Sequence, residues 1–195
     1  MISDEQLVKA MADGDEAAFE TLVRRYHAPI QAYAERMLHD RRKAEDTVQE
    51  TFLRLIRQME KGTVPEQVRP WLYRVAGNLC KDQFRKQEVR KESLVDDFVE
   101  EAVRNDAGVL QLVERQETRR ELLRVMNKLS ATQRQIVTLR FYHDLKLQEI
   151  SDALDMGLSA VKASLYSALR KLKTLLNQEG EPSPDEKEEI AHGKR

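Results

Sequence analysis

The sequence predicts an all-α fold made of two small helical domains joined by an acidic, flexible linker. Apolar residues recur at i, i+3, i+4 and i+7 through most of the chain, which is the period of helices with one buried face. Only 7 Gly and 5 Pro in 195 residues argue against an all-β fold rich in turns. The length suits one ordinary domain or two small ones, and an acidic stretch without the helical period divides the chain in two.

The first predicted domain spans residues 1–90 and begins with a capped helix. Ser3 and Gln6 have capping-box spacing, and Gly14 closes the short helix that they open. An apolar stripe over residues 19–26 indicates a second helix, which is expected to end near Pro29. Residues 30–38 repeat the stripe. We expect these helices to bury their apolar faces against one another as an antiparallel bundle.

Two further helices complete the first domain. A stripe over residues 48–59 lies on a helix that begins at Arg41. After a loop over residues 61–69, Pro70 suits the first position of the next helix, because its missing N–H is one that a helix start leaves unbonded. The apolar stripe of that helix covers residues 71–80, and the helical pattern is lost from Glu88 onward.

The linker is placed at residues 91–110 and the tail at residues 178–195. Asp96, Asp97, Glu100 and Glu101 make the linker acidic, which is typical of extended or partly ordered chain. The tail contains two prolines and few apolar residues, so it is predicted to be disordered.

The second predicted domain spans residues 111–177. A stripe over residues 122–129 indicates one helix, and Ser130 with Gln133 caps the next. Two elements follow in quick succession over residues 147–154 and 159–176, separated by the turn Asp155–Leu158. The second of them is basic, and Ser159 is expected to cap it.

Composition excludes several classes of protein. Cys80 is the only cysteine, which excludes an internal disulfide framework and a cysteine-based zinc site. The four histidines have no metal-like pairing and there is no Gly-rich phosphate loop, so we expect no catalytic residue, no metal, no cofactor and no small-molecule substrate. No basic and then apolar stretch precedes Asp4 and Glu5, and no apolar run approaches the length of a membrane span, so a cytoplasmic protein without a cleaved signal is expected.

The last two elements match the helix-turn-helix arrangement that reads a DNA major groove. Lys162 lies in the first turn of the second helix, the part closest to base edges. Helical hairpins that only pack have the same pattern, so the pattern alone leaves both interpretations open. The residues expected on the DNA side are Ser159, Ala160, Lys162, Ala163, Tyr166, Ser167 and Arg170.

The helix after Pro70 mixes aromatic, amide and basic side chains. Such a surface suits unpaired DNA, because cations follow the phosphates while rings and amides engage exposed bases. Trp71 taken by itself is expected in the core. The preceding helix differs in carrying polar and acidic side chains opposite its apolar stripe, which indicate either a solvated face or a docking face for a basic partner. These side chains are Glu45, Asp46, Gln49 and Glu50.

Three stretches together resemble the bacterial sigma factors. Lys43–Leu53 resembles their core-binding helix, and Pro70–Leu79 resembles their promoter-melting helix. Glu149–Leu172 looks like their helix-turn-helix. With only two helical domains and a short linker, the chain is identified as similar to the extracytoplasmic-function (group IV) sigma factors.

The resemblance implies a role for each part. The residues Glu45, Asp46, Gln49 and Glu50 would dock on the β′ clamp helices of RNA polymerase, with the β subunit as a further partner. The loop 61–69 would accept a flipped base of the −10 element, and the second domain would read the −35 element as duplex. An anti-sigma factor is the expected regulator. The positions matching the −10 contacts are Lys61, Arg69, Trp71, Arg74, Asn78, Lys81 and Arg85.

The sequence departs from the family pattern at several positions. Ser164 stands where a basic reader is common, and Leu169 replaces a further arginine. Lys146 stands where a serine usually caps the first helix of the pair. Gly77 is a weak helix former where a larger residue is usual. The resemblance still implies the same fold, whereas it does not imply which −35 sequence is read.

The function predicted from the sequence is promoter selection, not catalysis. The alternative is a helix-turn-helix regulator that binds its operator without polymerase. The two differ in whether the isolated chain binds DNA tightly.

Overall fold

The computed structural model describes residues 2–92 and 124–179. Helices are the only regular elements in these ranges, which confirms the all-α prediction. The chain divides into two compact units: Met1–Glu101 with Gln135–Lys162, and Ala102–Arg134 with Ala163–Arg195. Most of the predicted linker and tail lies outside the described residues.

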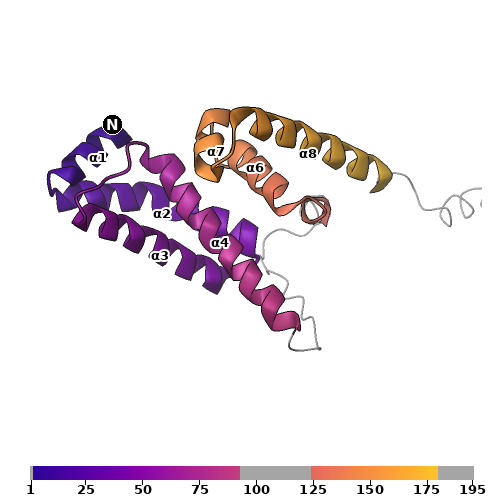
Figure 1. Cartoon of the computed structure of the whole chain (residues 1–195), viewed down its shortest axis with the longest axis horizontal. Coiled ribbons are helices and arrows are strands. Elements are labelled where there is room, and N and C mark those ends of the chain that lie inside the picture. The colour runs from indigo at the N-terminus through magenta and orange to yellow at the C-terminus, as the bar shows by residue number, and fades with distance from the viewer. Residues whose placement is uncertain (1, 93–123, 180–195) are drawn as a thin grey trace, which may run out of the picture. The chain divides into compact units, whose positions relative to one another are not determined.

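Four helices form the N-terminal bundle of the first unit. They are α1 (Asp4–Ala12), α2 (Glu16–Leu38), α3 (Arg41–Glu60) and α4 (Val68–Glu92). Helices α2 and α4 are both central, because each of them packs against the other three (Figure 1). Leu22, Ile30, Leu55 and Leu72 are fully buried in this bundle, so the apolar stripes of the sequence form its core.

The start of the bundle follows the sequence, but its second helix does not. Ser3 and Gln6 form the predicted capping box. Helix α2 continues through Pro29, where the sequence predicts an end. Tyr26, Ile30 and Tyr33 lie on one buried face on both sides of the proline. Burial of this continuous face offsets the cost of an interior proline, which is about 3 kcal/mol.

Helix α4 is longer than predicted at both ends. It begins at Val68, so Pro70 is its third residue and not its first. That position is still within the first turn, where a missing N–H costs no helical hydrogen bond. The helix continues to Glu92, past the loss of apolar periodicity at Glu88 and into the first two residues of the predicted linker.

The C-terminal part is helical at residues 124–127 and in α6 (Ala131–Phe141), α7 (Leu147–Leu154) and α8 (Leu158–Glu179). The capping box of Ser130 and Gln133 is present, with both hydrogen bonds at 3.2 Å. Helices α7 and α8 are joined by a short turn (Figure 1). Asp155 takes the left-handed conformation there with φ 53°, so the residue that reverses the chain is not Gly157.

Within the first unit, α7 packs on α4. The chain thus brings residues about 80 positions apart in sequence into contact, for example Arg69 and Glu149. Among the described helices, none combines the length and the apolarity needed to cross a membrane.

Candidate functional site

The polar side of α3 is an exposed arc, as predicted. Glu45, Asp46 and Gln49 are exposed and Glu50 is half-buried. The opposite side of the helix, including Val48, is buried in the bundle. We call the four polar residues the α3 arc. Its position on the bundle surface agrees with both a solvated face and a docking face.

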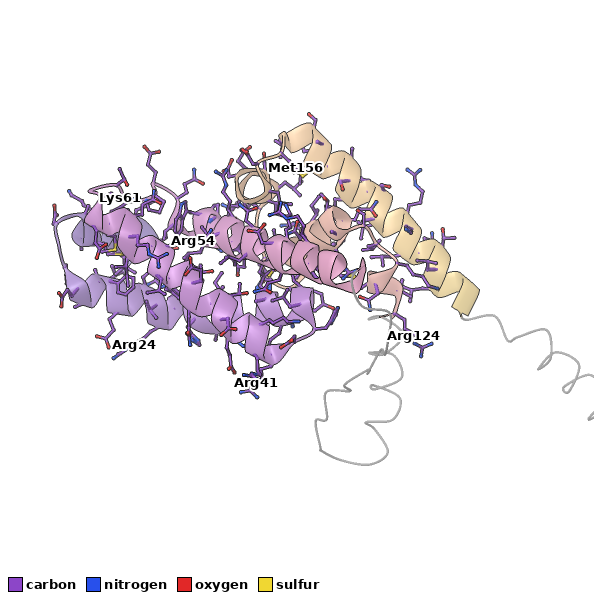
Figure 2. The ribbon with its side chains drawn as sticks, turned by 60° about the horizontal axis from the view of Figure 1, so that its bottom comes forward. Arg24, Arg41, Arg54, Lys61, Arg124 and Met156 are labelled. Carbon is purple, nitrogen blue, oxygen red and sulfur yellow. The ribbon has the colours of Figure 1, made fainter. Side chains whose placement is uncertain are left out.

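Two members of the α3 arc are paired with arginines of the same helix. Arg41 lies 3.1 Å from Glu45, and Arg54 lies 2.9 Å from Glu50 (Arg41 and Arg54 are labelled in Figure 2). Arg57 also reaches Glu50, at 3.2 Å. The hydrogen bond from Arg54, with the positive charge of both arginines, lowers the pKa of Glu50. These pairs reduce the negative charge of the arc at both ends and leave Asp46 as its unpaired carboxylate within the described chain.

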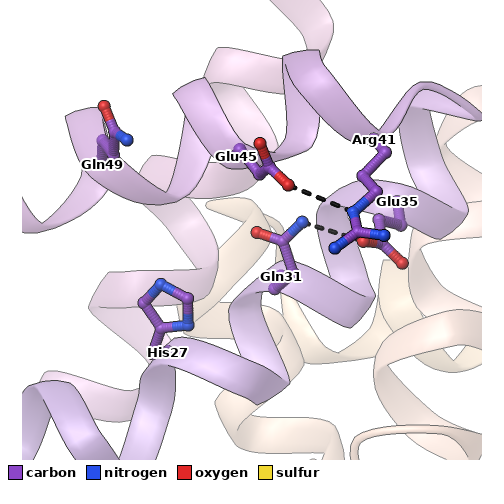
Figure 3. A pocket seen from close by; sticks show the side chains of 6 residues that line it. All are labelled: His27, Gln31, Glu35, Arg41, Glu45 and Gln49. Carbon is purple, nitrogen blue, oxygen red and sulfur yellow. Dashed lines mark hydrogen bonds and ion pairs between the residues drawn. The ribbon is translucent and has the colours of Figure 1, made fainter.

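A pocket of about 360 Å³ lies between α2 and α3, beside the arc. In Figure 3, Glu45 and Gln49 from α3 face Gln31 and His27 from α2. Gln31 donates to Glu35 at 2.8 Å, and the remaining lining residue is Arg41. The pocket is polar, so it extends the hydrogen-bonding surface of the arc toward α2.

Helix α4 presents a stripe of polar and basic residues. Arg74, Asn78, Lys81 and Arg85 are spaced at i, i+4, i+7 and i+11, so they share one face of the helix. Asn78, Lys81 and Arg85 are exposed. We call these four residues the α4 stripe. These side chains are spaced along the helix so that they can contact several successive phosphates and bases.

The remaining residues expected near unpaired DNA have different surroundings. Lys61 is exposed in the loop after α3 (Figure 2), whereas Trp71 is half-buried. Arg69 pairs with Glu149 at 3.3 Å and also donates to the backbone oxygen of His143. Arg74 donates to the backbone oxygen of Asp152. Sequence reasoning missed both of these arginine contacts.

Three aromatic rings form a cluster beside these arginines that sequence reasoning missed. Tyr33 and Tyr73 are 5.4 Å apart, edge to face, and His143 lies 5.8 Å and 5.2 Å from them. All three are buried. Burial raises the pKa of Tyr73 to about 12 and, with the charges of Arg36 and Arg69, lowers the pKa of His143 to about 4. Periodicity marks Tyr33 as a core residue, whereas the sequence suggests that Tyr73 belongs to the mixed aromatic and basic surface of α4. That interpretation of Tyr73 is wrong, because its side chain is only 2% exposed. Nothing in the sequence pairs either tyrosine with His143.

Helix α8 exposes the side that the sequence assigns to DNA. Tyr166 is 68% exposed. Lys162 is also exposed, and the buried side of the helix begins at Val161. The other exposed members of the set are Ser159, Ala160, Ala163, Ser167 and Arg170.

Ser159 is not the N-cap, which corrects the prediction. Helix α8 begins at Leu158, and the backbone oxygen of Gly157 accepts the first helical hydrogen bond, from Val161 at 3.0 Å. Ser159 is therefore an exposed residue of the first turn. At the other helix of the pair, Glu149 accepts a hydrogen bond from the backbone N–H of Lys146 at 2.7 Å, which is the half of a capping box that the third helical residue supplies. Lys146 makes no side-chain cap bond of the kind that a serine would make to the helix N–H groups.

Other reactive groups are inert in this structure. Cys80 is fully buried, and burial raises the pKa of its thiol to about 12. In the described ranges, no three His, Cys, Asp or Glu side chains are grouped closely enough to hold a metal ion. The sequence-predicted site residues thus lie mainly on three surfaces: the α3 arc, the α4 stripe and the exposed side of α8.

Comparison with known proteins gives a consistent match in both halves of the chain. The Sigma-70 region 2 family model matches residues 22–90, and the Sigma-70, region 4 model matches residues 119–172. The chain is 28% identical to the ECF RNA polymerase sigma factor SigX of Bacillus subtilis, over 81% of this chain and 83% of that protein. It is 26% identical to SigW of the same organism, over 84% and 93% of the two chains. The Escherichia coli sigma-E factor is 27% identical over 86% and 91%.

Two solved structures share the fold. CnrH, solved in complex with the cytosolic domain of CnrY, has a TM-score of 0.67 at 23% identity over 90% of this chain and 97% of its own. The sigma factor RpoE of Bartonella quintana, solved with the anti-sigma factor NepR, has a TM-score of 0.66 at 21% identity over 82% and 96%.

Proposed function

The chain belongs to the extracytoplasmic-function sigma factors, RNA polymerase sigma factors of the sigma-70 family, and we propose that it directs core polymerase to a limited set of promoters and helps to open them. The main support for this proposal is the order of the two matched regions along the chain. The region 2 match falls on α2, α3 and α4, and the region 4 match includes α6, α7 and most of α8. Core RNA polymerase and promoter DNA are therefore its partners.

The domain roles follow the predicted boundaries. Residues 1–90 bind core polymerase and the −10 element, and residues 111–177 bind the −35 element. Residues 91–110 link them, and residues 178–195 form the tail. The links between residue and role below are proposals that rest on exposure, spacing and charge.

The α3 arc docks on a basic surface of core polymerase, on the β′ clamp helices. Asp46 is its main electrostatic contact, because Glu45 and Glu50 already have arginine partners. Gln49 adds a hydrogen-bonding group beside it. Charge complementarity of this kind orients a partner and discriminates against wrong ones.

The α4 stripe and the loop before it bind the −10 element as a single strand. Lys81 and Arg85 are placed to follow phosphates, and Asn78 to bond a base edge. Lys61 lies in the loop that leads to α4, with Arg69 and Trp71 in the first turn of that helix. No hydrolysis is needed for opening, because each captured base stabilises the unpaired form by roughly 1–3 kcal/mol. The chain acts by binding and not as an enzyme.

The exposed side of α8 reads the −35 element in the major groove. Lys162 is in the first turn, where a recognition helix approaches base edges most closely. Tyr166 lies one turn farther along and offers an exposed ring to a thymine methyl group or to the sugar. Arg170 follows at the same spacing and is placed for a phosphate.

A protein that holds the chain inactive is a further expected partner. CnrH is solved with CnrY, and RpoE of Bartonella quintana is solved with the anti-sigma factor NepR. An anti-sigma factor would act on this chain by covering the same polymerase-facing and DNA-facing surfaces.

Reconstituted transcription tests the proposal. The full chain, added to core polymerase, should start transcripts at a small set of promoters in genomic DNA, and core polymerase alone should not. Without polymerase the chain should leave no specific footprint on the same promoters. Tight footprints by the chain alone, with no start sites in the presence of core polymerase, would instead identify an operator-binding regulator.

A further inference from the structure

We propose that the −35 element read by this chain is centred on two neighbouring A·T base pairs, whose thymine methyl groups contact Ala163 and Tyr166 of α8. The inference rests on the proposed role of α8 in binding duplex DNA, and it names the class of sequence that α8 selects. Four residues support it, and we call them the α8 centre line. They are Ser159, Ala163, Tyr166 and Arg170.

The α8 centre line lies nearly opposite the buried side of the helix. Its members are exposed and spaced at i, i+4, i+7 and i+11, so they share one face. At 3.6 residues per turn, this face is about 160° from the middle of the buried side. A helix in the major groove inserts the face that its own core does not cover, so the α8 centre line lies deepest in the groove. The buried side comprises Val161, Leu165, Ala168 and Leu172.

The middle of the α8 centre line is apolar. Ala163 presents a methyl group, and Tyr166, which is 68% exposed, presents an aromatic ring. Among the base edges in the major groove, only thymine carries a methyl group, and alanine and aromatic side chains are suited to contact it. The deepest part of α8 therefore matches A·T pairs better than G·C pairs.

The side chains that read other bases are scarce in this part of the helix. Guanine is typically read by arginine or lysine, adenine by asparagine or glutamine, and cytosine by aspartate or glutamate. From Ser159 to Leu169 the sequence contains none of these types except Lys162. Lys162 lies about 70° from the α8 centre line around the helix, so it is placed at the flank of the site and not at its centre.

An amide beside this surface is already used within the protein. Gln133 on α6 donates through Nε2 to the hydroxyl oxygen of Ser167 at 3.3 Å. Its Oε1 accepts a hydrogen bond from the backbone N–H of Ser130 at 3.2 Å. Because both ends of the amide have partners, Gln133 does not offer the free donor and acceptor pair that reads adenine.

The spacing of Ala163 and Tyr166 fits two neighbouring base pairs. Three residues along a helix correspond to a rise of about 4.5 Å. Neighbouring base pairs are separated by about 3.4 Å along the duplex. The long side chain of Tyr166 can bridge the difference, so each of the two residues can contact a methyl group of its own.

Removal of single thymine methyl groups tests the proposal. The full chain with core polymerase is assayed on a promoter that it uses, in which each −35 thymine in turn is replaced by deoxyuridine. This change removes one methyl group and keeps the base pair. We expect initiation to fall roughly fourfold at each of two neighbouring pairs, the factor for one buried methyl group. Deoxyuridine in the spacer between the −35 and −10 elements should have no effect.

Substitutions in α8 assign the two contacts. Tyr166→Ala should make initiation insensitive to deoxyuridine at one pair, and Ala163→Gly should do the same at the other. Tyr166→Phe keeps the ring and should stay sensitive at both pairs. Leu176→Ala is the matched control and should also stay sensitive, because Leu176 is a 38% exposed apolar residue of the same helix about 15 Å farther along. Helicity by circular dichroism should be retained in all four variants.

Full initiation with deoxyuridine at every −35 thymine would overturn the proposal, as would a −35 element without neighbouring A·T pairs. Sensitivity that persists at both pairs in Tyr166→Ala would overturn the contact with its ring. The proposed transcription function is judged separately, by start sites with core polymerase. If there are none, deoxyuridine is placed in duplexes that the full chain selects from a random library, and the same fourfold losses are then expected in binding.

Discussion

Asn78 is the residue on which promoter opening should depend most directly. Its side chain is exposed on the α4 stripe, between Arg74 and Lys81. We expect Asn78→Ala to impair initiation on duplex promoters, because an amide contact to an unpaired base stabilises the open form by roughly 1–3 kcal/mol. A template already mismatched across the −10 region should recover part of the loss. The measurement is transcript yield with core polymerase on the two templates.

The matched control for this experiment is Asn127→Ala, at an exposed asparagine outside α4. It should initiate normally on both templates. Equal defects of Asn78→Ala on duplex and mismatched templates would remove Asn78 from the melting step.

Lys162 should contribute to −35 selection. Its ammonium group is exposed in the first turn of α8. We expect Lys162→Ala to weaken promoter use by about 1–3 kcal/mol, the contribution of one good base contact, without changing core binding. Promoter variants with altered −35 sequences, assayed at several salt concentrations, measure the effect.

Lys173→Ala serves as the control because Lys173 is exposed on the same helix about three turns farther along. A loss in Lys162→Ala that is uniform across −35 variants, with a salt slope smaller by about one, would assign Lys162 to a phosphate and not to a base.

For single residues, the sequence predicts which side chains are exposed better than it predicts which side chains contact one another. The exposed set on α8 could be read from helical spacing, because the apolar residues define the opposite side. The contact partners of Arg69 and Arg74 could not be read from helical spacing, since 74 to 80 positions separate them from the arginines. The predicted N-cap, Ser159, is wrong by two positions, because Leu158 joins the helix and Gly157 becomes the cap.

Helix α3 should dock on polymerase through Asp46. Charge reversal at Glu50 would place a third arginine beside Arg54 and Arg57, and that crowding would affect the helix itself. Asp46→Arg avoids this problem. We expect it to cost several kcal/mol in association with core polymerase, because a positive charge would face a basic partner. The thermal midpoint should change little, since exposed charges contribute about 0–1 kcal/mol.

The assay is a pull-down of core polymerase beside a circular-dichroism melt of the free chain. Glu16→Arg, at an exposed acid in the first turn of α2, is the control and should bind normally. Retained binding by Asp46→Arg with an intact fold would contradict the docking role of the α3 arc.

Helices as elements were largely predictable, and the exceptions have physical causes. Capping boxes at Ser3 and Ser130 place two helix starts correctly, because the pattern is local. Pro29 fails as a helix end, since tertiary burial on both sides of it outweighs its local preference. The extension of α4 to Glu92 has no signal in the apolar periodicity, which describes burial and not helicity.

The whole molecule shows what sequence reasoning does not reach. The predicted domains separate residues 1–90 from 111–177, and these boundaries stay a prediction. The compact units join Gln135–Lys162 to the N-terminal bundle, through contacts at Tyr33, Tyr73 and Gly77. Helical periodicity marks a face as buried without saying which element covers it, so this packing could be found only in three dimensions.

The charges around His143 determine how the first compact unit responds to pH. Burial lowers the pKa of His143 to about 4, from 6.5, and the charges of Arg36 on α2 and Arg69 on α4 add to the effect. Asp144, in the same loop, opposes the shift. Glu149 on α7 is paired with Arg69. Tyr73 stays neutral in this range because its own pKa is raised to about 12. His143 therefore gains its positive charge at lower pH than an exposed histidine does, because its pKa is lowered from 6.5 to about 4.

Acid should destabilise the first compact unit through His143. The folded chain binds fewer protons at this residue than the unfolded chain, so its contribution to stability is complete above pH 6.5 and decreases as the pH falls from 6.5 toward 4. We expect the thermal midpoint of the full chain, measured by circular dichroism, to fall as the pH is lowered from about 7 to about 5. His143→Phe keeps a ring against Tyr33 and Tyr73 but cannot titrate, so its midpoint should fall less over the same range. A wild-type midpoint that does not change, or a variant midpoint that falls to the same extent, would show that another group controls the response to acid.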